Sequence, residues 1–330
     1  MNAAEAALAP ADVLRQRLLL AFGAPLRSLI VDRERRVALL ATVSVLAALA
    51  GACLAPLWML VLGPVVLGVP HLLADLRYLV VRPGLHRRAA LWLAVGLPLI
   101  ALAVSDSVWP GLAAAAGALL VSRGSASRKI LGLLAILALV LGARSLGGLR
   151  TGVVASHLHN LVAVAFWWTW RPRKGRLHWI PLGLCAAGVA FLLWGPPLEP
   201  VLSGPLGGLG LERMARVLSG GAPAAWALRL ALLYAFGQGV HYAVWLRLMP
   251  EEDRARGVPR SFRASLRALH RDMGPWILGA SALAALAIAL WAVADLAAAR
   301  AGYFRLALFH GHLELAALAL LWAEGRLDRA

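Results

Sequence analysis

The sequence predicts an all-α integral membrane protein, a polytopic bundle of about ten transmembrane helices with both termini in the cytoplasm. Three observations predict this fold class. Hydrophobic residues make up 61% of the 330-residue chain, and the mean hydropathy is +0.75. Apolar runs of about 20 residues, enough to cross a bilayer as a helix, recur from Val37 to Trp322. The basic residues alternate between successive loops, as the positive-inside rule requires.

The predicted elements follow in order along the chain. Residues 1–36 mix acids and arginines and are expected to form a cytoplasmic amphipathic segment without a cleavable signal peptide. Residues 37–330 are expected to form a single transmembrane domain. A stretch rich in Gly and Pro, 196–223, is the expected long outer loop, and a basic stretch, 249–274, is the expected long inner loop. The predicted spans are 37–55, 57–80, 90–105, 107–122, 129–144, 151–170, 177–195, 224–248, 275–300 and 302–322.

Charge supports this division. With the N-terminus inside, most of the 33 Lys and Arg residues fall in inner segments. The net charge of +17 is therefore explained by loops that face anionic lipid, and nucleic acid is not an expected partner. The two cysteines lie in predicted spans and form no CxxC motif. We expect a multi-pass protein of the bacterial inner membrane, and the sequence leaves the oligomeric state open.

Histidines within the predicted spans are the main functional signal. They occur on four spans that run in the same direction, and they occupy a layer only about 10 Å deep at about 1.5 Å per residue. Polar side chains are costly in hydrocarbon and indicate function by default. The six histidines are His71, His157, His159, His241, His310 and His312.

Helical geometry selects among them. Residues two apart on a helix point about 200° apart, so one histidine of each HxH pair faces elsewhere. His157 shares a face with Asn160, and His310 shares a face with Glu314. The predicted metal ligands are His71, His157, His241 and His310, with His159 and His312 as alternatives. The side chains expected to orient these ligands through hydrogen bonds are Asp75, Asn160, Gln238 and Glu314.

Several imidazoles without a thiolate suit non-haem iron or zinc. The stretch "GVPHLLAD" also resembles the G-x-P-H-x-x-x-D signature of the Brp/Blh family of membrane β-carotene 15,15′-dioxygenases. A later "HYAVW" fits the same plan, although His241 is followed four residues later by Trp245 where that family carries a second histidine. The resemblance implies Fe(II) as cofactor, dioxygen as co-substrate and a hydrophobic, membrane-dissolved substrate such as a carotenoid.

Three other functions stay open at this point. A b-type haem protein would use two of the histidines as axial ligands. A proton- or ion-coupled transporter would use His71, Asp75, Arg305 and Glu314 as a charge relay. A zinc-dependent membrane hydrolase is the third alternative, although the chain contains no HExxH motif. The sequence identifies no catalytic residue beyond the candidate ligands.

Overall fold

A computed structural model describes residues 3–21, 23, 28–29, 31–105, 107–173, 175–202, 204–255 and 257–326. Parts of the predicted N-terminal segment (1–2, 22, 24–27 and 30) lie outside the described residues, as do position 203 of the outer loop and position 256 of the inner loop. Apart from an isolated bridge between Leu206 and Leu209, the described residues form helices and connecting segments. The predicted all-α class is therefore confirmed.

The helices follow one another along the chain, with π-helical or 3-10 segments labelled η. They are α1 (Ala3–Ala7), α2 (Ala9–Ala21), α4 (Arg33–Leu54), α5 (Pro56–Asp75), η1 (Leu76–Val81), η2 (Leu85–Arg87), α6 (Ala89–Leu91), η3 (Trp92–Gly96), α7 (Leu97–Val104), α8 (Trp109–Leu120), α9 (Ala126–Leu146), α10 (Gly148–Thr169), α11 (Trp179–Trp194), α12 (Leu211–Ser219), α13 (Ala224–Ala243), η4 (Val244–Leu248), α14 (Met249–Glu252), α15 (Phe262–Ala294) and α16 (Leu296–Ala323).

Five helical segments within the described chain are long and apolar enough to cross a membrane. They are Arg33–Leu54, Pro56–Val81, Ala126–Leu146, Phe262–Ala294 and Leu296–Ala323. A sixth span results if α12 and the α13–α14 segment, which meet at 92°, count as one. Large apolar side chains such as Trp276 and Val293 on α15 are each 88% exposed, which suits contact with lipid. These helices identify an integral membrane protein, whereas ten spans and their orientation stay predictions.

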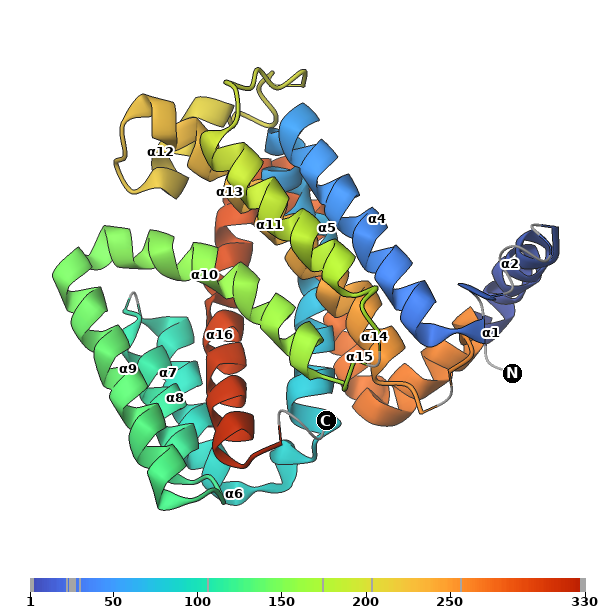
Figure 1. The fold of residues 1–330 in the computed structure, drawn as a ribbon, viewed down its shortest axis with the longest axis horizontal. Helices are drawn as coiled ribbons and strands as arrows, with labels where there is room; N and C mark the ends of the chain where they lie inside the picture. Colours follow the sequence, from blue (N-terminus) through green and yellow to red (C-terminus); the bar gives the residue numbers. More distant parts are fainter. Residues whose placement is uncertain are drawn as a thin grey trace.

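Two helices organise the bundle (Figure 1). The red helix α16 packs against α5, α7, α8, α10 and α15, and α13 packs against α4, α5, α10, α11 and α12. The contact between α5 and α16 requires a glycine, because a Cβ added at Gly68 would overlap the ring of Tyr303. The beginning of α4 and the end of α16 lie on the same side of the bundle.

The boundary between the last two predicted spans differs from the observed one. The hydropathy pattern predicts a break near residue 301, but α15 ends at Ala294, and Asp295 caps α16 by accepting a hydrogen bond from the Ala298 N–H at 2.9 Å. Arg300, expected in an outer loop at the end of the predicted span 275–300, therefore lies within α16. Its Nε donates to the carbonyl of Leu60 at 2.8 Å.

The predicted outer loop contains a helix of its own. Within 196–223, α12 packs against α13 and buries Met214, Ala215 and Leu218. Gly220, in the left-handed region at φ 59°, ends α12 and allows the sharp turn into α13. The inner face of α12 is therefore part of the core. The predicted inner loop is also partly helical, since α15 begins at Phe262 and breaks at Gly274, where φ is 74°.

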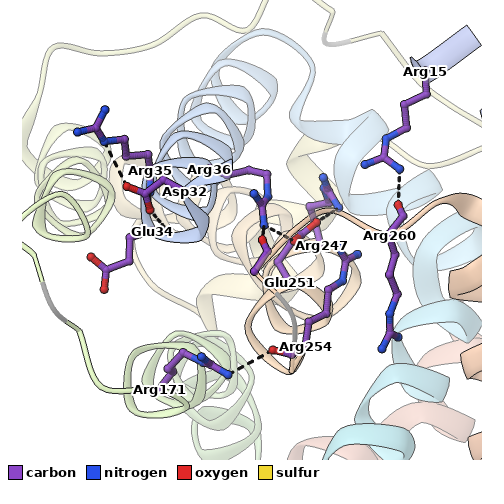
Figure 2. Close-up of polar contacts among 11 residues, drawn as sticks. Arg15, Asp32, Glu34, Arg35, Arg36, Arg171, Arg247, Glu251, Arg254 and Arg260 are labelled. Atoms are coloured by element: carbon purple, nitrogen blue, oxygen red, sulfur yellow. Dashed lines mark hydrogen bonds and ion pairs between the residues drawn. The ribbon is translucent and has the colours of Figure 1, made fainter. Parts of the chain in front are cut away.

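Buried ion pairs join the segments at the end of the bundle where α4 begins (Figure 2). Glu251 on α14 is fully buried and accepts from three arginines: Arg247 at 3.0 Å, Arg254 at 3.0 Å and Arg36 at 3.3 Å. Both of its carboxylate oxygens are paired. This cluster connects α4 to α14, two elements far apart in the sequence.

Candidate metal centre

His71 is positioned by α5, which carries Pro64 and Pro70 within its length. The side chain is 1% exposed. Its Nδ1–H donates to the Leu67 carbonyl at 3.2 Å, which leaves Nε2 as the nitrogen with a free lone pair. Nε2 has no hydrogen-bond partner among the described residues. A histidine oriented in this way, with one nitrogen held by a carbonyl, is the usual arrangement of a metal ligand.

Four histidines from four helices form a closed ring. From His71 on α5, the centroid of the next imidazole lies 5.4 Å away at His241 on α13 and 4.9 Å away at His310 on α16. His159 on α10 closes the ring, 4.4 Å from His241 and 4.5 Å from His310. One ligand atom from each of His71, His241 and His310 lies within 4.8 Å of the other two. The structure thus brings three of the four predicted ligands together.

The fourth predicted ligand, His157, lies outside this ring. Its Nε2 donates to the Leu218 carbonyl at 3.2 Å, and its ring packs 5.3 Å from that of Tyr234. His159, the alternative of that pair, faces the other three histidines instead. His312, the alternative of the second pair, packs against Gly111 and donates from Nδ1 to the Leu308 carbonyl at 3.3 Å.

Glu314 joins the ring from one turn beyond His310. It is fully buried, and its Oε2 lies 3.1 Å from Nδ1 of His159, while Oε1 lies 3.9 Å from Nε2 of His241. His159, His241 and Glu314 form a second set of ligand atoms that all lie within 4.8 Å of one another. Glu314 can therefore either orient the imidazoles or act as a ligand itself.

Trp245 is a site residue that the sequence reasoning did not select. Its Nε1–H donates to Oε1 of Glu314 at 2.7 Å, and the indole is fully buried. Trp245 lies in the π-helical segment η4, directly after the helix that carries His241. π-helical turns often occur at functional sites. The signal in the sequence was the spacing of four residues between His241 and Trp245.

The other three polar side chains predicted beside the ligands have different surroundings. Asp75 is fully buried, and neither carboxylate oxygen has a hydrogen-bond partner within the described chain. Asn160 is also buried and packs beside Gly237. Gln238 points to Tyr242 and donates to its hydroxyl from Nε2 at 2.9 Å. Glu314 is thus the predicted neighbour for which the structure shows close contacts with the histidine ring.

The donor set matches a divalent metal ion. The buried nitrogens His71 Nε2, His241 Nδ1 and His241 Nε2 lack hydrogen-bond partners in the described part of the chain, as does Oε2 of Glu314. Leaving such groups unpaired costs about 1–3 kcal/mol each, and a bound cation would satisfy several of them together. Imidazole and carboxylate donors without sulfur suit iron or zinc.

Comparisons with known proteins assign no family. No protein-family model, no curated protein and no solved structure matches the chain.

Proposed function

We propose that the protein is an integral-membrane non-haem iron oxygenase of the bacterial inner membrane that acts on a hydrophobic, membrane-dissolved substrate. The observation that carries the proposal is the ring of four buried imidazoles, with adjacent ring centroids 4.4–5.4 Å apart. His71, His159, His241 and His310 would hold the metal. Fe(II), when bound, would supply the activation of dioxygen.

The chain's own residues would orient the ligands and exclude water. Leu67 and Ala307 accept hydrogen bonds through their carbonyls from Nδ1 of His71 and His310. Trp245 holds Glu314 beside His159 and His241. Phe166 and Trp245 are fully buried, with their rings 5.9 Å apart, and this packing beside Glu314 keeps bulk water away. Such a dry environment favours reaction with an apolar substrate over side reactions with water.

The alternatives fit this ring less well. A haem with two histidine ligands needs its macrocycle between them, whereas these four imidazoles contact one another directly. A charge relay would use the same buried polar groups, so metal content is what separates a transporter from the oxygenase. The resemblance of "GVPHLLAD" to the Brp/Blh family supports iron and a carotenoid-like substrate.

The test is reconstitution of the purified full chain with Fe(II) in lipid nanodiscs without oxygen, followed by addition of oxygenated buffer and β-carotene. The proposal predicts oxygen uptake coupled to loss of the carotenoid. His159→Ala should abolish both activity and iron binding, and the matched variant His157→Ala, on the same helix, should keep both. A protein that binds zinc tightly, is active with zinc and does not bind iron would contradict the proposed oxygenase function.

A further inference from the structure

A cavity of about 380 Å³ lies between α4, α5 and α13, beside the histidine ring. Its walls are mostly apolar and small, and they include Ala47, Ala48, Gly63 and Gly239. A Cβ added at Gly239 would lie 2.7 Å from Met59 and 3.0 Å from Ala48, so the glycine permits close packing of α13 on α4 and α5 at this wall.

The cavity opens on the apolar outer surface of the bundle. Leu67, one of its lining residues, is 37% exposed, and Val43 and Leu46, which flank the lining residues Ser44 and Ala47 on α4, are exposed as well. In a membrane protein this surface faces acyl chains. A molecule dissolved in the bilayer can therefore enter without crossing water.

The inner end of the cavity is polar, and Tyr242 separates it from the histidine ring. Gln238 and Tyr242 line it, and the Tyr242 ring lies 4.8 Å from the His71 ring. Gln238 is 4% exposed, and its amide donates to the Tyr242 hydroxyl. Its Oε1 has no hydrogen-bond partner in the described ranges. An unpaired buried acceptor is costly, and it would be satisfied by a donor on a bound ligand.

We infer that this cavity binds a long apolar alcohol, with the Gln238 amide turning its buried Oε1 toward the cavity to accept the ligand hydroxyl and with the hydrocarbon chain directed toward the lipid. A hydroxyl is the neutral donor that an elongated apolar molecule can carry into this site at a small desolvation cost. The alcohol would lie one side chain, Tyr242, from His71. That this alcohol is the substrate rests on the proposed function; the binding site itself does not.

The experiment measures binding of radiolabelled hexadecan-1-ol and of its methyl ether to the purified full chain. The ether keeps the chain and the oxygen but lacks the donor. The wild-type protein should bind the alcohol about tenfold more tightly than the ether, the effect of one buried hydrogen bond. Gln238→Met, which preserves volume and removes the acceptor, should lower alcohol affinity to that of the ether and leave the ether unchanged.

A second variant, Ala47→Phe, fills the cavity and should weaken binding of both probes at least tenfold. The wild-type comparison of alcohol with ether requires no mutation, so the inference is tested even if a variant fails to fold. Equal binding of both probes would overturn it and would indicate a site for lipid acyl chains. Unchanged binding in Ala47→Phe would also overturn it.

Iron content measured on the same samples separates the two proposals. His71→Ala should lose iron and keep the alcohol-to-ether preference, because Gln238 and the cavity walls are intact. Wild-type protein that binds iron without preferring the alcohol would refute this inference alone. Wild-type protein that prefers the alcohol and binds no iron would refute the proposed function alone.

Discussion

Buried carboxylates in two regions of the molecule differ in whether their oxygens are paired. At the end of the bundle where α4 begins, Glu251 is fully buried and each of its oxygens is paired with at least one arginine. In the core of the bundle, Glu314 and Asp75 are equally buried. Asp75 has no hydrogen-bond partner in the described chain, and Glu314 has one on a single oxygen, from Trp245.

This difference in pairing indicates different roles for the carboxylates of the two regions. A buried charge is tolerated when it is paired and hydrogen-bonded, so the Glu251 cluster is complete and its role is to hold segments together. The core carboxylates and histidines are incomplete within the described chain. Buried polar groups without partners are costly, and a metal ion is the ligand that would suit imidazoles and carboxylates together.

The largest effect is expected from a substitution that breaks the complete ion-pair cluster around Glu251. Glu251→Ala would leave Arg36 and Arg254, which are themselves buried, without their shared carboxylate. Removing one partner of a buried ion pair destabilises a protein by about 3–5 kcal/mol. Thermal unfolding in detergent should show a large drop in midpoint, while the iron content of the folded fraction should be unchanged. Loss of iron without loss of stability in Glu251→Ala would contradict the structural role assigned to the Glu251 cluster.

An intermediate effect is expected at the core carboxylates. Glu314→Gln should weaken iron binding by about 10–100-fold, because a neutral amide attracts a cation less strongly than a carboxylate does. Stability without metal should change little, since Oε2 of Glu314 makes no hydrogen bond and an amide oxygen can still accept the one that Trp245 donates to Oε1. Metal titration monitored by calorimetry measures the first quantity, and thermal unfolding of the metal-free protein measures the second.

Asp75→Asn provides the companion measurement, with the same expected direction of effect on iron binding. A strongly destabilised metal-free Asp75→Asn protein would show that this carboxylate has a structural role.

The smallest effect concerns Glu324, just beyond α16, which is a second carboxylate with complete pairing. Burial acts to raise its pKa, but hydrogen bonds from the Arg123 N–H at 3.0 Å and from Arg88 at 2.7 Å prevail, and the pKa is lowered from 4.5. The ionised form is therefore favoured in the folded state. Its contribution to stability is fully present above about pH 4.5 and is lost as the pH falls through the lowered folded-state pKa.

Glu324→Gln should flatten the pH dependence of the unfolding midpoint in this acidic range, with Glu212→Gln as a control, because Glu212 lies on the exposed side of α12. An unchanged pH profile in Glu324→Gln would show that the hydrogen bonds of this carboxylate add nothing to folding.

Much of the fold follows from sequence patterns that depend on local chemistry. The apolar run predicted at 37–55 corresponds to α4, and the histidines fall within helices as expected. The predictions were wrong where long-range packing determines the bounds and the placement of helices. Asp295 caps α16 earlier than hydropathy indicated, and α12 folds onto α13 within a stretch whose Gly and Pro content suggested an open loop.

The sequence predicts which helices carry the candidate site. It predicts less well which face of each helix turns toward that site. His157 was preferred to His159 because Asn160 shares its face, but the rotation of α10 is set by its packing against α13 and α16. Spacing along one helix contains no information on that rotation. The contact of Trp245 with Glu314 joins residues 69 positions apart, so it could not be read from either helix alone.

The most direct test of the central claim is the iron content of the full chain, purified in detergent and measured by mass spectrometry. The comparison is between His71→Ala/His241→Ala, which removes two members of the ring, and His157→Ala/His312→Ala, which removes two histidines from the same bundle that lie outside it. We expect near-stoichiometric iron in the wild type and in the His157/His312 variant, and almost none in the His71/His241 variant. Wild-type levels of iron in His71→Ala/His241→Ala would contradict the account.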